Sequence, residues 1–483
     1  MLTVNRAVYR QQVETFVHSG ASRHSLGLVY GRRRIGKSTL LEAVAAERRG
    51  FYWEATRTEA PIQRSRLGEA LGAHLGVGRL AFDTWEDAVR QLLRLGADHS
   101  VPVVLDEVGH VLEADPSFDS VLASMLGPGE QRQHPGAARL ILCGSAIALL
   151  GALTAGEAPL RGRAGLELVM QPSEYREAAE SLGPGADLGL ATRLYAVIGG
   201  VIGYATDMVD HDLPSGPEDF DRWVAARVLS PAATLHHEAT TLLAEDPTLT
   251  VSSPVVHHSV LAAIANGSVT AGRIANQLRR SVSNLEPTLK RLISAGFVVR
   301  HADPVRSQRP TYALGDPFLQ FHYAVLEPHG PLLRDRDPRA AWDQRLSSVF
   351  DRRVRGPVFE EQARTWVRRH ASAETLGGFA DHVGPSLLSA RGQERQLDVV
   401  VAKADADLPA ARTIIAIGEA KSGETVGSGH LHALEQARSS FGPRAAHAKL
   451  LLFAPSFSTS LLTEAARRSD VELIDLERLY AGS

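Results

Sequence analysis

A glycine-rich segment near the start of the chain fits the pattern G-x-x-x-x-G-K-[ST] and follows the apolar run 26–30. Backbone N–H groups of such a loop, together with the N-terminus of the next helix, stabilise the charge of bound phosphates. Lys37 would contact the β- and γ-phosphates of a nucleotide, and the Ser38 hydroxyl would bind Mg²⁺. The residues expected to hold ATP are Gly31, Arg32, Arg33, Arg34, Ile35, Gly36, Lys37, Ser38 and Thr39.

Two adjacent carboxylates end a second apolar run. Asp106 and Glu107 follow the segment 101–105, and Ser145 follows another apolar run further along the chain. Asp106 would hold Mg²⁺ through water, and Glu107 would polarise the water that attacks the γ-phosphate. Ser145 is a candidate sensor of that phosphate. A glycine-rich turn or an acidic turn can each occur by chance, but their order along the chain favours ATP hydrolysis.

A third group of charged residues lies in the last part of the chain. Glu360 is expected on a helix, Asp398 in an apolar strand, and Glu419 and Lys421 at the end of the next strand. Since alternate side chains of a strand share a face, Glu419 and Lys421 point the same way, and Asp398 could meet Glu419 across a hairpin. These carboxylates would bind Mg²⁺ or Mn²⁺, and Lys421 would orient or deprotonate a metal-bound water. Glu-x-Lys alone is common, but the combination predicts a PD-(D/E)xK nuclease site, with Glu360 as an additional ligand.

The elements that must position these residues alternate between strands and helices in the first part of the chain. This alternation predicts a parallel sheet covered by helices. Helices are expected over 38–48 and 85–95, and the segment 172–246 has no strand pattern. The expected strands are 25–30, 51–55, 101–105, 139–143 and 166–170.

The segment from 254 to 310 is basic, with eight Lys and Arg residues against two acidic ones, although the whole chain has a net charge of −3. Two helices joined by a short turn, followed by two short strands, resemble a winged helix-turn-helix, in which the second helix enters the major groove of DNA. A protein-interaction module is the alternative. The residues expected to face bases are Ser281, Ser283, Asn284 and Thr288. Those expected to face phosphates are Arg279, Arg280, Lys290, Arg291, Arg306 and Arg309.

Several motifs follow one another in a fixed order. They are Tyr30–Ser38, Leu105–Glu107, Cys143–Ala146, Pro159–Arg163 and Val197–Val201, preceded by Asn5-Arg6. Together they resemble the archaeal-type AAA ATPases of the signal-transducing NTPase group. The resemblance implies ATP hydrolysis, a γ-phosphate-sensing arginine at Arg163 with Arg161 beside it, and a nuclease-like C-terminal domain. Ile202 departs from the family pattern, which has proline after the residue that follows Gly-Gly.

The sequence therefore predicts a multidomain α/β protein with four parts. They are a P-loop ASCE/AAA-type ATPase core (1–171), a helical lid (172–250), a winged-helix domain and connector (251–345), and a restriction-endonuclease-like PD-(D/E)xK domain (346–483). ATP, Mg²⁺ or Mn²⁺, DNA and a second copy of the chain are the expected partners. The alternative is an ATP-driven signalling or transcriptional switch whose C-terminal domain binds without cleaving.

The amino-acid composition excludes several classes of protein. Hydrophobic residues make up 44% and charged residues 22%, which excludes a disordered chain. A single cysteine, Cys143, excludes an internal disulfide and a thiolate zinc cluster. The N-terminus lacks a signal peptide, and the apolar runs are too short to cross a membrane, so a cytoplasmic protein is expected.

Overall fold

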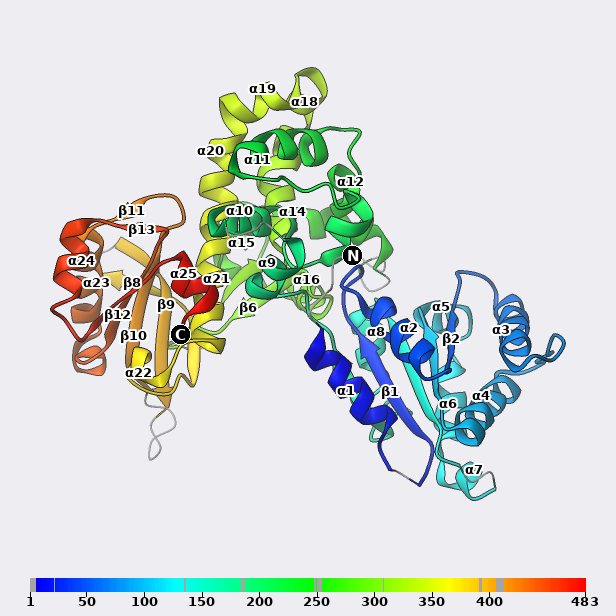
Figure 1. Cartoon of the computed structure of the whole chain (residues 1–483). Helices are drawn as coiled ribbons and strands as arrows, with labels where there is room; N and C mark the ends of the chain where they lie inside the picture. Colours follow the sequence, from blue (N-terminus) through cyan, green and yellow to red (C-terminus); the bar gives the residue numbers. More distant parts are fainter. Residues whose placement is uncertain are drawn as a thin grey trace. The chain divides into compact units, whose positions relative to one another are not determined.

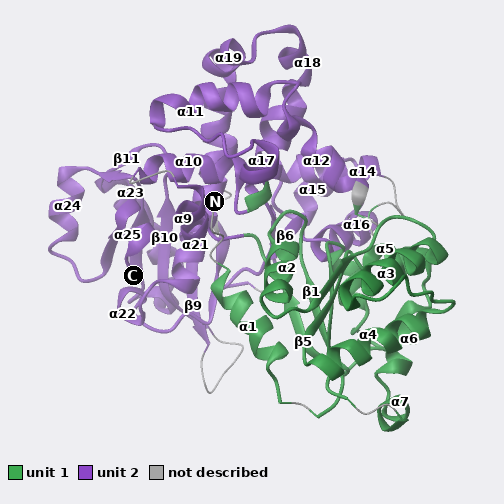
Figure 2. Ribbon diagram, turned by 45° about the vertical axis from the view of Figure 1, so that its right-hand side comes forward, with its two compact units in different colours: residues 1–172, 201–203, 246–251 green, residues 173–200, 204–245, 252–483 purple. Residues whose placement is uncertain are grey.

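The computed structural model describes residues 6–483 except 21, 134–135, 184–186, 247–248, 250–253, 307, 391–392 and 405–411. The chain forms two compact units (Figure 2). Unit 1 consists of residues 1–172, 201–203 and 246–251, and unit 2 of residues 173–200, 204–245 and 252–483. Most of the expected lid, the expected winged helix and the C-terminal domain thus belong to one unit. Among the described residues, no helix has the length and apolar character needed to span a bilayer.

Unit 1 is built on a parallel sheet, of which Figure 1 labels β1 and β2. The strand order is β2-β3-β4-β1-β5. Its strands are β1 (Ser25–Tyr30), β2 (Phe51–Glu54), β3 (Pro102–Asp106), β4 (Arg139–Gly144) and β5 (Ala164–Val169). All five expected strands are present, with ends shifted by at most two residues. Because β4 lies between β1 and β3, the segments that follow these three strands meet at one edge of the sheet. In this order the segments that follow β1 and β3 lie on either side of the segment that follows β4.

Helix α4 shows how the sequence covers one face of this sheet. Thr84 caps its first turn by accepting a hydrogen bond from the Asp87 N–H, as serine and threonine often do at this position. Trp85, Val89 and Leu92 recur at helical spacing and are buried against the sheet. The helices of unit 1 are α1 (Ala7–Val17), α2 (Lys37–Glu47), α3 (Ala60–Leu75), α4 (Trp85–His99), α5 (Gly109–Ala114), α6 (Phe118–Met125), α7 (Pro128–Gln133) and α8 (Ile147–Ala152).

The first part of unit 2 is helical, as expected. Its helices are α9 (Tyr175–Leu182), α10 (Leu188–Ile198), α11 (Pro217–Val224) and α12 (Thr234–Glu245), with π-helical turns at Tyr204–Met208 and Ala225–Leu229. A later helical stretch contains α17 (Pro317–Phe321), α18 (Glu327–Asp335), α19 (Pro338–Ala341) and α20 (Ser347–Phe350), interrupted by further π-helical turns at His322–Leu326, Trp342–Leu346 and Asp351–Arg355.

Between these stretches lie three helices and a hairpin, in the order expected for a winged helix. They are α14 (Pro254–Ala265), α15 (Ala271–Gln277), α16 (Val282–Ser294) and the antiparallel strands β6 (Val298–His301) and β7 (Thr311–Leu314). Ser281 caps α16, and Leu285, Leu289 and Leu292 form its buried face. The loop of the hairpin packs on the C-terminal sheet, where buried Asp303 accepts hydrogen bonds of 3.0 Å from the Ser386 hydroxyl.

The C-terminal part contains a mixed sheet with the order β14-β12-β10-β9-β8. Its strands are β8 (His382–Ala390), β9 (Gln393–Ala404), β10 (Arg412–Ala420), β12 (Lys449–Phe453) and β14 (Val471–Ile474), and a second short pair joins β11 (Thr425–Val426) to β13 (Ser456–Phe457). Its helices are α21 (Gly356–Arg369), α22 (Ala373–Leu376), α23 (Ser428–Ser440), α24 (Thr459–Ala465) and α25 (Leu476–Ala481), with a 3₁₀ turn at Gly442–Ala445. Helices α21 and α23 belong to separate apolar clusters, which contain different residues of β10, so they cover opposite faces of the sheet.

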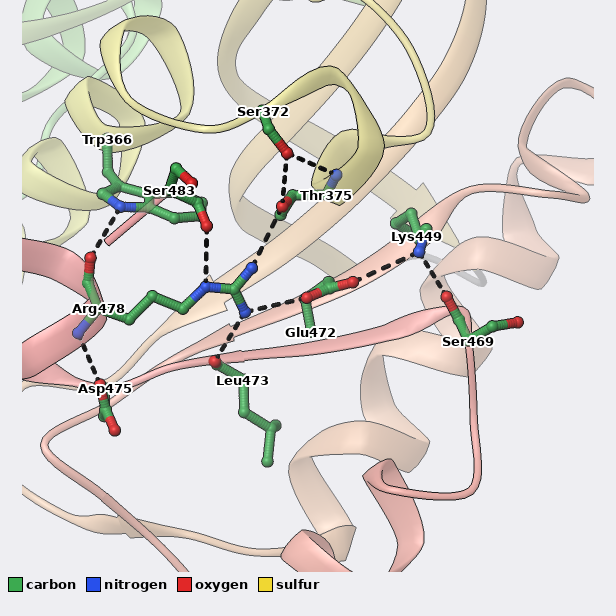
Figure 3. A network of polar contacts seen from close by, with 10 residues as sticks. All are labelled: Trp366, Ser372, Thr375, Lys449, Ser469, Glu472, Leu473, Asp475, Arg478 and Ser483. Carbon is green, nitrogen blue, oxygen red and sulfur yellow. Dashed lines mark hydrogen bonds and ion pairs between the residues drawn. The ribbon is translucent and has the colours of Figure 1, made fainter. Parts of the chain in front are cut away.

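A polar network joins α25 to the edge of this sheet (Figure 3). Arg478 donates hydrogen bonds to Glu472 Oε2 at 2.9 Å and to Thr375 Oγ1 at 3.2 Å. Lys449 on the neighbouring strand forms an ion pair with Glu472 at 3.4 Å. The network therefore holds a lysine–glutamate pair in a structural role.

Candidate functional site

The glycine-rich loop after β1 has the backbone conformation that wraps a phosphate. Gly31 has φ of 156°, and a Cβ there would lie 2.3 Å from the Met170 carbonyl oxygen. Gly36 has φ of 90°, in the left-handed region that favours glycine. Helix α2 begins at Lys37, so its N-terminal N–H groups face the loop. The structure thus positions these residues as a phosphate-binding loop requires.

Lys37 lies inside this loop rather than in solvent. Its side chain is buried, and Nζ donates a 2.8 Å hydrogen bond to the Arg32 carbonyl. Burial lowers the pKa of Lys37, although nearby Asp106 and Glu107 act in the opposite direction. The remaining loop residues differ in exposure: Gly31, Arg32 and Ile35 are buried, Arg34 and Gly36 are half-buried, and Arg33, Ser38 and Thr39 are exposed.

Arg6 forms hydrogen bonds to the backbone of the phosphate loop, a contact that the Asn5-Arg6 motif did not reveal. Its guanidinium donates hydrogen bonds of 2.8 Å to the carbonyl oxygens of Ile35 and Gln171. It thereby ties the phosphate loop to the segment after β5. Asn5, the other residue of the resemblance motif, lies outside the described residues.

The acidic pair lies beside the loop at the end of β3. Asp106 is fully buried and accepts hydrogen bonds from the Tyr52 hydroxyl at 2.6 Å and from the Glu107 N–H at 2.7 Å. Burial acts to raise the pKa of Asp106, but hydrogen bonds from Cys143, Ser38 and Tyr52 outweigh it, and the pKa is lowered. An ionised Asp106 next to the Ser38 hydroxyl is a donor set that fits Mg²⁺.

Glu107 is oriented by two features. It has φ of 48°, an uncommon conformation for a residue with a Cβ, and such strain concentrates at functional sites. The Ser145 hydroxyl donates a 3.2 Å hydrogen bond to Glu107 Oε2. The structure therefore brings the candidate phosphate sensor and the candidate water-polarising carboxylate into direct contact.

Tyr52 is a residue of this site that the sequence analysis missed. Its ring lies on β2 beside β3, and burial followed by the hydrogen bond to Asp106 raises the pKa of its hydroxyl. The side-chain alternation of β2, which places Tyr52 and Glu54 on one face, was the available signal.

Arg163 does not lie where it could sense the γ-phosphate of a nucleotide bound by the same chain. It precedes β5, whose first residue Ala164 pairs with Leu26 near the start of β1, whereas the loop follows Tyr30. A strand rises ~3.3 Å per residue, so Arg163 lies roughly 16 Å along the sheet from the loop. Its guanidinium donates instead to the Ala123 carbonyl, and Arg161 donates to the Gly156 carbonyl at 2.7 Å. This position argues against a role of Arg163 in the nucleotide site of the same chain.

The second group of candidates converges at the junction of β9 and β10. The antiparallel register pairs Val399 with Gly418, which puts Asp398 opposite Glu419. Asp398 is buried and accepts a 3.0 Å hydrogen bond from the Ala420 N–H. Lys421 Nζ lies 2.9 Å from Glu419 Oε1. Three of the four expected residues therefore face one another across the two strands.

Opposite charges keep Glu419 and Lys421 ionised. Burial acts to raise the pKa of Glu419, but Lys421 and Arg395 outweigh this effect and lower it. Burial acts to lower the pKa of Lys421, and the hydrogen bond to Glu419 raises it overall. Arg395, which donates to Glu419 Oε2 at 2.7 Å, was not singled out in the sequence.

Glu360 approaches this group from α21. Burial, followed by repulsion from Asp398, raises the pKa of Glu360 to about 8. Burial also raises the pKa of Asp398. Arg364, a buried residue that the sequence analysis missed, donates to the Asp398 carbonyl at 2.8 Å and lies 3.8 Å from Glu360 Oε2. The carboxylates of Glu360 and Asp398 are neighbours, and each disfavours its own negative charge. Together they form a donor set suited to a hard divalent cation.

The full expected ligand set does not form one compact cluster. Within the part of the chain that the structure describes, no group of three or more His, Cys, Asp or Glu side chains has the arrangement of a metal site. Glu360, Asp398 and Glu419 therefore do not all converge on one point, and a cation here would need backbone carbonyls or water beside two carboxylates.

The expected DNA-facing surface is largely exposed. Ser281, Ser283 and Asn284 at the start of α16 are accessible, but Thr288 is buried because it falls on the face that carries Leu285 and Leu292. The expectation that Thr288 contacts a base is therefore wrong. The six expected phosphate-contacting residues are all exposed: Arg279, Arg280, Lys290, Arg291, Arg306 and Arg309.

No family model matches the chain. The uncharacterized protein MJECL04 of Methanocaldococcus jannaschii is 22% identical over 334 residues, which cover 67% of this chain and 70% of that protein.

Solved structures with a similar course of the chain include two archaeal proteins. The Walker-type ATPase paby2304 of Pyrococcus abyssi has a TM-score of 0.49 at 19% identity, covering 67% of this chain and 96% of that one. The ORC2 protein of Aeropyrum pernix, solved as ADPNP and ADP complexes, has a TM-score of 0.38 at 16% identity, covering 68% and 92%.

Proposed function

We propose that this chain is an ATPase that regulates a DNA-binding module and a metal-dependent PD-(D/E)xK nuclease. Unit 1 supplies the nucleotide site. Unit 2 supplies most of the lid (172–250) and of the winged-helix domain and connector (251–345), and all of the nuclease-like domain (346–483). The single observation that carries the nuclease assignment is the placement of Asp398 opposite Glu419, with Lys421 at 2.9 Å from Glu419.

The nucleotide site supports hydrolysis through groups that are already oriented. Lys37 would stabilise the phosphate charge from within the loop, and Glu107, held by the Ser145 hydroxyl, would polarise the attacking water. Ser38 and Asp106 would hold Mg²⁺, which when bound neutralises charge on the β- and γ-phosphate oxygens. Arg163 would act on the nucleotide of a second copy of the chain.

The C-terminal site supports cleavage of a phosphodiester. Asp398 and Glu419 would hold Mg²⁺ or Mn²⁺, which when bound lowers the pKa of water and polarises the scissile phosphate. Lys421 would orient the water or stabilise the developing negative charge. Arg364 would position Asp398 and Glu360 through its contacts with both.

Removing charge from the winged helix is expected to weaken DNA binding. Replacing Arg279, Arg280 and Arg291 with alanine should lower the affinity and make its salt dependence shallower, by about 0.9 in the log–log slope for each lost phosphate contact. Fluorescence anisotropy of labelled duplex DNA at several salt concentrations measures both quantities. A control variant removes exposed arginines from other elements of unit 2: Arg222, Arg227 and Arg467. Equal affinity of the two triple variants would mean that this module connects domains instead of binding DNA.

The coupling of the two sites is tested with several nucleic acids. Wild-type protein is incubated with Mn²⁺ and single- or double-stranded DNA or RNA, with and without ATP. We expect cleavage of a DNA form to change with ATP in the wild type but not in Lys37→Ala, which keeps the nuclease residues. Identical cleavage with and without ATP in the wild type would contradict regulation by the ATPase.

A second function, an ATP-driven switch, is favoured by one observation. Glu419 is already paired with both Arg395 and Lys421, as a carboxylate in a purely structural network would be. In that case the C-terminal domain would bind a partner without cleaving. ATP-dependent assembly of the protein, with no cleavage of any nucleic acid, is the outcome that supports the switch.

A further inference from the structure

The side chain of Tyr52 reaches the buried carboxylate of Asp106 from the neighbouring strand of unit 1. Strand β2 pairs with β3 in a parallel register that places Tyr52 beside Val104 and Glu54 beside Asp106. Alternate residues share a face, so Asp106 lies on the same face of the sheet as Tyr52, two residues or roughly 7 Å further along. The Tyr52 side chain spans this distance, and its hydroxyl donates a 2.6 Å hydrogen bond to Asp106 Oδ2.

Both oxygens of the Asp106 carboxylate therefore have a hydrogen-bond donor. The Glu107 N–H donates to Oδ1 at 2.7 Å, and the Tyr52 hydroxyl donates to Oδ2. The torsion angle that rotates an aspartate carboxylate has a broad preference, so the two oxygens are not fixed by the side chain itself. A donor on each oxygen fixes their orientation. Asp106 is fully buried, so solvent does not compete for these contacts.

Tyr52 also contacts the other candidate Mg²⁺ ligand. Ser38 forms side-chain hydrogen bonds with both Tyr52 and Asp106. Cys143 bonds to Asp106 as well, from β4 on the other side of β3. Tyr52 is thus a side chain that touches both Ser38 and Asp106, the two residues of the donor set that fits Mg²⁺.

We propose that Tyr52 is a positioning residue for the cation of the nucleotide site: its hydroxyl holds the Asp106 carboxylate and the Ser38 hydroxyl in the orientation in which both bind Mg²⁺ together with ATP. This role rests on the proposed ATPase function, in which Ser38 and Asp106 hold Mg²⁺. Because Mg²⁺ requires near-ideal octahedral geometry, the orientation of each oxygen donor affects the affinity for the cation. Hydrogen-bond partners of metal ligands typically contribute about 10–100-fold to that affinity.

The test measures nucleotide affinity instead of turnover. All proteins carry Glu107→Gln, which keeps the backbone N–H that bonds to Asp106 and removes the carboxylate expected to polarise water. Calorimetry gives the dissociation constant of ATP in EDTA and at saturating Mg²⁺, and the ratio of the two constants is the gain in affinity that Mg²⁺ provides. Tyr52→Phe keeps the ring and removes only the hydroxyl. Tyr323→Phe in unit 2 is the matched control, because it removes the hydroxyl of a buried tyrosine, 2.8 Å from His258 Nδ1.

We expect Tyr52→Phe to reduce the gain from Mg²⁺ by about tenfold or more and to leave the affinity for ATP in EDTA unchanged. Tyr323→Phe should change neither quantity. Added to Asp106→Ala, Tyr52→Phe should cause no further loss, because Tyr52 acts through Asp106. The double variant also keeps the test decisive if Tyr52→Phe alone fails to fold, since it leaves no buried carboxylate without its donor.

The outcomes separate this role of Tyr52 from the proposed function. An unchanged gain in Tyr52→Phe, or a further loss when Tyr52→Phe is added to Asp106→Ala, would overturn the positioning role alone. A lower melting temperature of Tyr52→Phe with an unchanged gain would show a purely structural tyrosine and would likewise overturn it. No gain from Mg²⁺ in the protein that carries only Glu107→Gln would contradict the proposed cation site and, with it, the role of Tyr52.

Discussion

Replacing Lys37 with alanine is expected to reduce ATP turnover by about 10²–10³-fold, the usual cost of removing one preorganised charge-stabilising donor. Lys37 is buried within the phosphate loop, with Nζ 2.8 Å from the Arg32 carbonyl, so it needs no rearrangement to meet a phosphate there. Steady-state phosphate release measures the effect. Lys403, an exposed lysine on β9, is the control, and its alanine variant should hydrolyse ATP as the wild type does.

Glu107→Gln separates hydrolysis from binding at the same site. Glutamine keeps the size of the side chain and can still accept a hydrogen bond from the Ser145 hydroxyl, but it polarises water less. We expect this variant to bind ATP with nearly unchanged affinity and to lose turnover. Normal turnover in both Lys37→Ala and Glu107→Gln would refute the assignment of the nucleotide site.

Replacing Lys421 or Asp398 with alanine is expected to lower the rate of Mn²⁺-dependent DNA cleavage strongly. Lys421→Ala should lower the rate by about 10²-fold or more, as the loss of a proton-transfer or charge-stabilising group does. Asp398→Ala should reduce cleavage to the level without protein, since it removes a carboxylate that a cation needs. Gel analysis of labelled DNA over time measures both.

Two further variants make this result interpretable. Asp398→Asn keeps an oxygen that can accept the hydrogen bond from the Ala420 N–H, so lost cleavage with an unchanged melting temperature would point to charge rather than to folding. Lys449→Ala is the matched control, because Lys449 pairs with Glu472 (Figure 3) much as Lys421 pairs with Glu419. Cleavage that survives in Lys421→Ala and Asp398→Ala would exclude the nuclease site.

Local chemistry made parts of both sites predictable. The phosphate loop and the acidic pair at Asp106 are short motifs whose backbone and charge requirements are contained in adjacent residues, so they appear directly in the sequence. The five strands of unit 1 were also predictable, because buried parallel strands are continuous apolar runs bounded by turns. The alternation of side chains correctly placed Glu419 and Lys421 on one face.

Contacts between distant segments were decided only by the tertiary structure. Arg364 contacts Asp398, although its position carries no local signal. The Asn5-Arg6 motif marks Arg6 but does not show that Arg6 contacts the phosphate loop. Thr288 has the polarity of a base-contacting residue, but the rotation of α16 buries it.

The sequence by itself determined which residues can do chemistry near the phosphate loop and which acids can bind a cation. The tertiary structure decided which of them meet. Strand order and register are properties of the whole sheet, set by long-range pairing. For this reason Asp398 lies opposite Glu419, whereas Arg163, which its motif places among the nucleotide-site residues, lies at the other edge of the sheet.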